Sequence, residues 1–183
     1  MATPSKLRIV GGVWRSRVLR FVEAEGWRPT PGRVRETLFN WLGQELHGLK
    51  CLDLFAGSGA LGFEAASRGA ASVVMVESNA AAQRALLENI KLLNATQIEA
   101  HRGDALGFLV NNQQKFDVIF LDPPFHQGWL EKLLPQLSGH LSENGLVYVE
   151  AETTLMLSGD WTIHKQGKAG NVYYHLLKYA NGT

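Results

Sequence analysis

The 183-residue chain lacks the features that define several classes of protein. Its single cysteine, Cys51, excludes an internal disulfide framework and is typical of a reducing compartment, so we expect a cytoplasmic location. No apolar run approaches the roughly 18 residues that a membrane span needs. The first residues, MATPSKLRIVGG, also lack the apolar stretch of a signal peptide. We therefore expect no contact with a membrane.

Metal-ligand patterns and nucleophile constellations are missing as well. The six histidines are dispersed, and none lies at metal-ligand spacing from another or from Cys51. No Ser-His-Asp or Cys-His arrangement is visible. Cys51 stands where an apolar segment begins, which favours a buried structural thiol over a nucleophile. We expect no metal site.

What is present is the composition of an ordinary globular protein, with 45% hydrophobic and 19% charged residues. The length suits one domain with a proper core. The net charge of +1 hides an asymmetry, because residues 1–50 carry nine Lys or Arg against four Glu, whereas residues 51–183 carry nine against thirteen acids. A basic arm on an acidic body favours a polyanionic partner, and solvated surface charge explains the asymmetry equally well.

From Cys51 onward, short apolar runs alternate with helical patterns. The runs CLDLF, SVVMVE, QIEAH, FDVIFLD and GLVYVEA predict strands, and the segments between them predict helices. This alternation indicates a parallel sheet covered on both faces, since parallel neighbours need crossover helices. The tail WTIHKQGKAGNVYYHLLKY predicts an antiparallel hairpin. The prediction is an α/β, Rossmann-like class I methyltransferase fold with a mostly parallel seven-stranded sheet and a C-terminal antiparallel hairpin.

The first residues are organised differently. LRIVGGVWRSRVLRF predicts two short strands, Pro29 and Pro31 interrupt the chain, and GRVRETLFNWLGQEL predicts an amphipathic helix. The core of this segment is too small to stand alone. We predict a basic β-hairpin-and-helix extension over residues 1–48 and a main domain over residues 49–183.

The stretch FAGSGALG contains a Gly57-x-Gly59-x-x-Gly62 turn, and Glu77 follows about twenty residues after Gly57. Between a strand and a helix, this pattern indicates a cofactor that contains adenosine. A dinucleotide would need its pyrophosphate at the helix N-terminus. S-adenosylmethionine has no phosphate, and the glycines would instead let the backbone approach its amino acid and ribose ends.

Three acidic residues distinguish these cofactors to different degrees. Asp53 is placed to hold the ammonium group of S-adenosylmethionine, and a pyrophosphate site does not need it. Glu77 would accept from ribose hydroxyls in either cofactor. Asp104, in HRGDAL, would accept from the adenine amino group or cap the following helix, and the two roles are compatible.

The fourth predicted strand of the main domain ends in Asp122-Pro123-Pro124-Phe125. Two prolines hold the backbone extended, which suits a site that presents acceptors in fixed directions. The exocyclic amine of a nucleobase is a poor nucleophile, because its lone pair is spread into the ring. Asp122 and the Pro123 carbonyl would hold its two N–H bonds, and Phe125 would stack on a flipped or single-stranded base. This motif favours methyl transfer over nicotinamide chemistry.

FAGSGALG, VES, GDA and DPPF together resemble the class I S-adenosylmethionine-dependent amino-methyltransferases. RIVGGVWRSRVLRF and RPTPGRVRETLFNWL are similar to the N-terminal region of the bacterial RsmD family, which methylates the N2 amine of one guanine in 16S ribosomal RNA. The resemblance runs from about Lys6 to Tyr179. It departs at Pro31-Gly32, where we expect a more polar pair before the helix.

The resemblance implies roles for the residues at the matching positions. The catalytic set is Asp122, Pro123 and Phe125. The implied contacts with the cofactor S-adenosylmethionine are Asp53, Phe55, Ala56, Gly57, Ser58, Gly59, Glu77, Ser78, Asp104 and Ala105. The implied partner is 16S ribosomal RNA or the small ribosomal subunit, assembled or assembling, and we expect a monomer.

An RNA substrate also accounts for the basic extension. Its arginines can meet phosphates, and an aromatic residue between them offers a stacking surface. The predicted RNA contacts are Arg8, Trp14, Arg15, Arg17, Arg20, Arg33, Arg35 and Pro124. Alternatively, the hairpin arginines face only water, and those at the helix start pair with Glu36 or with an acid of the main domain.

Two other functions remain as alternatives. A DNA adenine-N6 methyltransferase would share DPPF, although such enzymes usually need a larger target-recognition segment. A non-enzymatic RNA chaperone would keep the basic extension but would not need Asp122 or Glu77.

Overall fold

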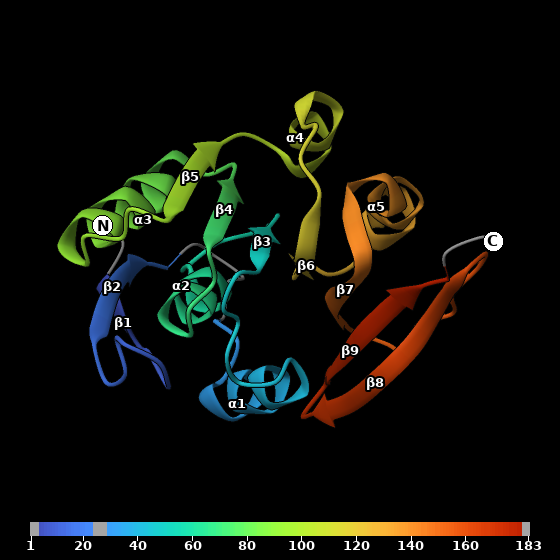
Figure 1. The fold of residues 1–183 in the computed structure, drawn as a ribbon, viewed down its shortest axis with the longest axis horizontal. Coiled ribbons are helices and arrows are strands. Elements are labelled where there is room, and N and C mark those ends of the chain that lie inside the picture. Colours follow the sequence, from blue (N-terminus) through green and yellow to red (C-terminus); the bar gives the residue numbers. More distant parts are fainter. Residues whose placement is uncertain (1–3, 24–28, 181–183) are drawn as a thin grey trace.

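The computed structural model describes residues 4–23 and 29–180, so the outer ends of both predicted domains, residues 1–3 and 181–183, lie outside the described residues. A seven-stranded sheet in the order β5-β4-β3-β6-β7-β9-β8 forms the centre (Figure 1). Its strands are β3 (Lys50–Asp53), β4 (Ser72–Glu77), β5 (Ile98–Arg102), β6 (Phe116–Leu121), β7 (Leu141–Ala151), β8 (Trp161–Ala169) and β9 (Val172–Tyr179). The first five strands pair in parallel, whereas β9 is antiparallel to both β7 and β8. The predicted mostly parallel sheet with a C-terminal antiparallel hairpin is confirmed.

Helices cover both faces of this sheet, as Figure 1 shows. They are α1 (Gly32–Trp41), α2 (Ala60–Ser67), α3 (Ala80–Leu92), α4 (Ala105–Asn111) and α5 (Trp129–Leu137), followed by the short 3-10 helix η1 (Ser138–His140). Successive side chains of a strand point to opposite faces. Val73 and Met75 of β4 therefore pack in the cluster that includes α1, α2 and α3, while Val74 and Val76 pack in the cluster that includes α4 and α5. Within the described residues, no helix is long and apolar enough to cross a membrane.

Cys51 lies inside this core, at the second residue of β3. Its side chain is fully buried, and burial raises the pKa of the Cys51 thiol to about 12. A thiol that stays protonated at neutral pH is a poor nucleophile. The prediction of a buried structural thiol is confirmed.

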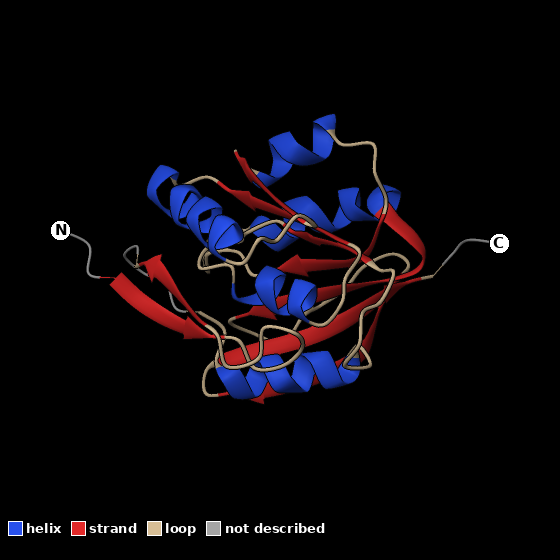
Figure 2. Cartoon of the chain, turned by 60° about the vertical axis from the view of Figure 1, so that its left-hand side comes forward, coloured by secondary structure: helices blue, strands red, loops and turns tan. Residues whose placement is uncertain are grey.

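The N-terminal extension consists of a hairpin and α1. Strands β1 (Pro4–Arg8) and β2 (Val18–Val22) pair antiparallel and lie at one side of the molecule (Figure 2). Leu7 and Leu19 belong to the same hydrophobic cluster as α2 and α3, and Asn89 of α3 donates a hydrogen bond to the Arg20 carbonyl at 2.9 Å. The extension therefore shares the core of the main domain. The boundary between residues 48 and 49 stays a prediction.

A buried ionic network fastens the extension to α2. Glu64 of α2 is fully buried, and its carboxylate accepts from the N–H groups of Val10 at 2.8 Å and Gly11 at 2.9 Å. Arg35 of α1 and Arg68, just after α2, pair with the same carboxylate at 3.3 and 3.0 Å. One carboxylate thus connects the hairpin turn, α1 and α2.

The start of α1 reflects the unusual Pro31-Gly32 pair. Pro31 occupies the N-cap position and forms no side-chain cap hydrogen bond, although its carbonyl accepts from the Arg35 N–H at 3.0 Å. Phe39 is fully buried, and the half-buried Trp41 stacks on Tyr174 with ring centroids 5.3 Å apart, so α1 packs against the core through both aromatic residues.

Candidate active site

The acidic residues singled out in the sequence gather at one edge of the sheet. Asp53 and Glu77 end β3 and β4, Asp104 follows β5, and Asp122 follows β6. The carboxyl ends of parallel strands share an edge, and ligands bind where the strand order reverses. Here that reversal lies between β3 and β6, which are neighbours although two strands separate them in the sequence. The sheet therefore brings these four carboxyl groups to one edge.

The glycine turn between β3 and α2 requires its glycines. Gly57 and Gly59 have positive φ angles of 54° and 85°, which other residues rarely adopt. A Cβ atom on Gly59 would also lie 2.4 Å from the Phe63 ring, and one on Gly62 would lie 2.3 Å from Cε of Met75. The first two glycines shape the turn, and the third lets α2 pack closely on β4.

Glu77 holds this turn in place. The Gly57 N–H donates to one carboxylate oxygen at 3.0 Å, and the Asn79 N–H donates to the other at 2.7 Å. Each carboxylate oxygen has a further lone pair, so the same group has acceptor capacity left for hydroxyl donors. Ser78, between these residues, is exposed.

Asp53 is buried at the base of the same turn, with 1% of its surface exposed. Burial, and to a smaller degree the neighbouring Glu77 and Glu150 carboxylates, raises the pKa of Asp53 to about 7. The Phe55 N–H opposes this shift by donating to Asp53 at 3.3 Å. A buried carboxylate near other carboxylates attracts a cation and repels an anion.

The remaining residues of the predicted cofactor site surround the turn. Phe55 is half-buried and packs edge-on against Trp129, while Ala56 and Ser58 are buried. Asp104 accepts from the Gly107 N–H at 2.7 Å, which confirms its predicted role as the N-cap of α4, and Ala105 behind it is buried. A cavity of about 510 Å³ opens beside Asp104.

This donor set fits S-adenosylmethionine. The cofactor carries an ammonium group and a positively charged sulfur, and the carboxylates at this edge are acceptors for cations. The pyrophosphate of a dinucleotide would instead meet Asp53 and Glu77 as like charges. The close-packed glycine turn is compatible with either cofactor, so the carboxylates make the distinction.

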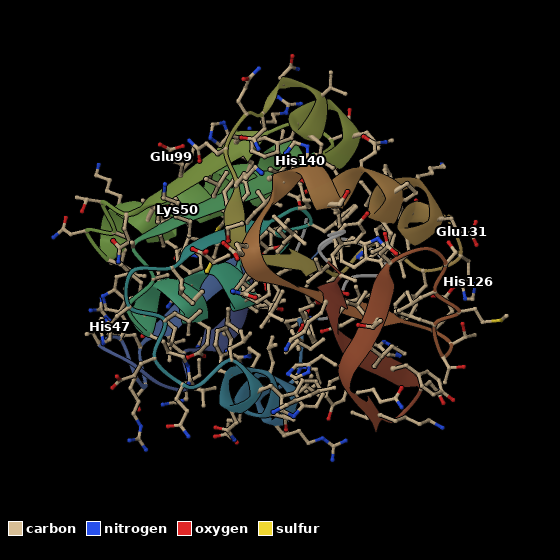
Figure 3. The ribbon with its side chains drawn as sticks, turned by 45° about the vertical axis from the view of Figure 1, so that its right-hand side comes forward. His47, Lys50, Glu99, His126, Glu131 and His140 are labelled. Atoms are coloured by element: carbon tan, nitrogen blue, oxygen red, sulfur yellow. The ribbon has the colours of Figure 1, made fainter. Side chains whose placement is uncertain are left out.

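The Asp-Pro-Pro-Phe motif lies directly after β6. Asp122 is half-buried, Pro123 is buried, Pro124 is exposed and Phe125 is half-buried. A cavity of about 650 Å³ opens beside this motif, between α5 and residues 152–160. His126 lines the same cavity, and Figure 3 shows it at the outside of the molecule near Glu131 of α5. The motif therefore has an open space next to it.

Glu150, near the end of β7, is a buried carboxyl group that the sequence interpretation missed. Glu150 is 6% exposed. The pKa of Asp122 is raised first by the burial of Asp122 itself and then by the neighbouring Glu150. A signal for it was present, because GLVYVEA ends in a glutamate much as SVVMVE ends in Glu77.

The predicted RNA contacts fall into two groups. Arg8, Arg15, Arg17, Arg20 and Arg33 are exposed, and Trp14 is half-buried against the core. Figure 1 shows that the β1–β2 hairpin, which carries or adjoins most of them, lies on the opposite side of the view from the C-terminal β8–β9 hairpin.

Arg35 requires a correction. It is 5% exposed, and its guanidinium donates to the carbonyls of Thr30 and Arg8 and pairs with Glu64. The expected RNA contact is therefore replaced by the alternative, an ion pair with an acid of the main domain. The physical reason is that a charge buried to this degree needs a compensating partner inside the protein.

The comparisons with known proteins agree with this geometry. The family model Conserved hypothetical protein 95 matches residues 7–178. Ribosomal RNA small subunit methyltransferase D of Escherichia coli strain K12 is 41% identical over 178 residues, covering 94% of this chain and 90% of that protein. The protein of the same name from Haemophilus influenzae is 43% identical and covers 94% of each chain. The solved structure of yhhF from Escherichia coli has a TM-score of 0.86 and 40% identity, with 96% of this chain and 98% of that chain covered.

The fold and the strand-end site define a class I S-adenosylmethionine-dependent methyltransferase. Within that class, the chain belongs to the Conserved hypothetical protein 95 family, to which the RsmD resemblance pointed.

Proposed function

We propose that this protein transfers a methyl group from S-adenosylmethionine to the exocyclic N2 amine of a guanine in 16S ribosomal RNA. The observation that carries the proposal is the position of Asp122 and Pro123 at the end of β6, next to the β3 strand end where Asp53 and the glycine turn lie. Membership of the family of ribosomal RNA small subunit methyltransferase D supports the RNA substrate. A DNA adenine substrate is not favoured, because the curated relatives act on ribosomal RNA.

The proposal assigns the cofactor to the glycine turn and the carboxylates around it. Asp53 would hold the ammonium group, Glu77 the ribose hydroxyls and Asp104 the adenine amino group. Phe55, Ala56, Gly57, Ser58 and Gly59 would line the turn, with Ser78 and Ala105 beside the acids. When bound, S-adenosylmethionine supplies a methyl group activated by a positively charged sulfur.

The substrate amine is assigned to the Asp-Pro-Pro-Phe motif. Asp122 and the Pro123 carbonyl would each accept one N–H bond of the amine, which fixes its orientation and directs its lone pair toward the methyl carbon. Phe125 and Pro124 would contact the base, and the cavity of about 650 Å³ beside them offers room for it. Catalysis in this arrangement comes mainly from holding two bound reactants in a productive geometry.

The basic extension is assigned to the RNA backbone. Arg8, Arg15, Arg17 and Arg20 lie in or beside the hairpin, and Arg33 is near the start of α1. Exposed arginines contribute affinity for phosphates without reading sequence, and the half-buried Trp14 adds an aromatic edge. A monomer acting in the cytoplasm on the RNA or the small subunit completes the proposal.

The test is methyl transfer from labelled S-adenosylmethionine to small-subunit particles that lack their own modifications. Naked ribosomal RNA and DNA run beside them, and the products are digested to nucleosides and identified by mass. We expect N2-methylguanosine, and we expect Asp122→Ala to lower its rate of formation by about 10²–10⁴-fold. Methyladenine in DNA would overturn the substrate, and RNA binding without any modification would favour the chaperone alternative.

A further inference from the structure

Glu150 holds a buried carboxyl group that the proposed mechanism does not yet use. It lies on β7 two residues after Tyr148, so both side chains are on the same face of the sheet. One carboxylate oxygen of Glu150, Oε1, accepts from the Tyr148 hydroxyl at 2.7 Å and from the Thr30 hydroxyl at 2.7 Å. Thr30 belongs to the N-terminal extension and is itself 4% exposed.

Both donors keep their protons at neutral pH. Thr30 does not titrate, and burial followed by the charge of Glu150 raises the pKa of Tyr148. Each hydroxyl has a single proton, and each directs it to the same oxygen. Glu150 is the acceptor in both hydrogen bonds, so two hydroxyl groups fix the position of its side chain.

The other neighbour of Glu150 is the proposed substrate acceptor, Asp122. Leu121 of β6 pairs with Val149 of β7 in the parallel register, so Asp122 and Glu150, one residue further along each segment, lie beside each other. The charge of Glu150 raises the pKa of Asp122, after the larger effect of burial. The hydroxyls of Tyr148 and Thr30 hold the Glu150 carboxyl group in place beside Asp122.

We propose that Glu150 is a positioning residue for methyl transfer, which acts by forming with Asp122 a carboxyl pair that sets when Asp122 can accept a proton. The inference rests on the proposed function, since it concerns the residue that would contact the target amine. It also gives the N-terminal extension a direct connection to the reaction, through the hydroxyl of Thr30.

The proton balance of the reaction is simple. The amine nitrogen forms a bond to the methyl carbon while the carbon–sulfur bond breaks, and the bonding electrons stay on sulfur, which becomes neutral. The nitrogen is left with one proton too many, and the ionised carboxylate of Asp122 accepts it. Protonated Asp122 then releases this proton to water when the products leave.

Other charged and titratable groups face Asp122 and Glu150 from the neighbouring elements. Asp53 of β3 lies close enough for its charge to raise the pKa of Asp122, and Glu77 of β4 stands behind it. From β9, Tyr174 lies opposite Glu150, and His175 is buried with its pKa lowered by burial. From the extension, the Arg35 guanidinium is directed to Glu64.

The test compares Glu150→Gln with Tyr148→Phe. The glutamine keeps an oxygen for the two hydroxyls but replaces the charge beside Asp122 by a neutral amide that donates. The acidic midpoint of the pH–rate profile should therefore move down by about one pH unit or more. Tyr148→Phe removes a donor from the Glu150 anion, so the midpoint should move up. Glu143→Gln, an exposed acid on the same strand, serves as the matched control.

A second readout does not depend on activity. The carboxyl carbon of Asp122 can be followed by NMR in protein labelled with ¹³C-aspartate, with Asp122→Asn used to assign the signal. Its titration midpoint should move down in Glu150→Gln and up in Tyr148→Phe, as the midpoint of the pH–rate profile does. Thr30→Val should behave like Tyr148→Phe, and Thr30→Ser, which keeps the hydroxyl, should match the original protein.

The outcomes separate the inference from the proposed function. If both variants leave the midpoints within the range of Glu143→Gln, or shift them in the same direction, the carboxyl pair is wrong even though the protein methylates RNA. If the protein methylates no RNA but the NMR midpoints shift in opposite directions, the pair stands and the substrate is wrong. Should Glu150→Gln fail to fold, Tyr148→Phe and the two Thr30 variants still decide the question.

Discussion

The carboxyl group of Glu64 and those at the strand ends differ in whether the protein places cations beside them. Glu64 is fully buried and has four partners, the guanidinium groups of Arg35 and Arg68 and the N–H groups of Val10 and Gly11. Two of these partners are cations, so the charge of Glu64 is compensated inside the protein. Breaking such a network leaves charges buried without partners.

The carboxylates at the strand ends have no such compensation. In the part of the chain that the structure describes, no Lys or Arg pairs with Asp53, Asp122 or Glu150. The hydrogen bonds that Asp53 and Glu150 accept come from neutral hydroxyl and N–H groups. Their nearest charged neighbours are other carboxylates. Burial thus raises the pKa of Asp53 and of Asp122. The protein supplies the cation for the structural acid Glu64, and under the proposed function a ligand supplies it for Asp53.

The largest expected effect comes from removing the compensated acid. Glu64→Ala leaves Arg35 and Arg68 without their partner and two N–H groups without an acceptor, so we expect a loss of about 3–5 kcal/mol in the free energy of unfolding. Chemical denaturation measures it, with Glu45→Ala as the control because the Glu45 side chain is 78% exposed. A loss below about 1 kcal/mol would remove the distinction between the two groups.

Asp53→Asn should have the reverse effect on stability. Removing an uncompensated buried charge raises the free energy of unfolding at pH 8 by about 1 kcal/mol. The same change removes the proposed partner of the ammonium group, so affinity for S-adenosylmethionine should fall about 10²-fold. Calorimetry measures both quantities. Lower stability together with unchanged affinity would mean that Asp53 is a structural residue like Glu64.

The strand-end site was largely predictable from the sequence, because its signals are local. A glycine turn after an apolar strand and a double proline after another have geometric requirements that each stretch carries by itself. The alternation of strands and helices then fixes which edge their ends share. The sequence alone therefore predicts that the acids at positions 53, 77, 104 and 122 lie together at this edge.

The compensated network around Glu64 and the contacts of Glu150 were not predictable in the same way. Arg35 and Glu64 are 29 positions apart, and Thr30 and Glu150 are 120 positions apart, so only packing brings them together. Pattern rules recognise an arginine at a helix start but not which acid it will meet. Element ends were also displaced: β7 begins at Leu141, ahead of the predicted GLVYVEA, and α1 ends at Trp41, before the predicted limit at Leu46.

The pH dependence of the free energy of unfolding, measured without ligand, should also distinguish the strand-end acids from Glu64, with a smaller effect. Because the folded pKa of Asp53 is about 7 and the unfolded value is near 3.8, the folded state holds its proton more tightly. The stabilisation from this residue is present below pH 4 and is lost as pH rises through 7. Thermal unfolding should show this decline between pH 4 and 7, and Asp53→Asn should lack it. An equal slope in both proteins would contradict the pKa assignment.

Affinity for the cationic cofactor should change in the other direction. Only ionised Asp53 attracts the ammonium group, so affinity for S-adenosylmethionine should rise about tenfold between pH 5 and pH 6 and level off above pH 7. Isothermal titration in two buffers with different ionisation enthalpies would detect the proton released on binding. A flat profile in the original protein would show that the site is already ionised without its ligand.

The smallest effect is expected at an arginine that lies on the surface and takes no part in the buried network. Arg17 is exposed beside β2, whereas Arg35 is buried against Glu64. Arg17→Ala should change the free energy of unfolding by less than about 0.5 kcal/mol. It should weaken binding to 16S ribosomal RNA a few-fold at low salt and reduce the slope of log affinity against log salt by about one. Filter binding across a salt series measures this slope. If Arg17→Ala leaves it unchanged while Arg33→Ala reduces it, the RNA follows the start of α1 and not the hairpin.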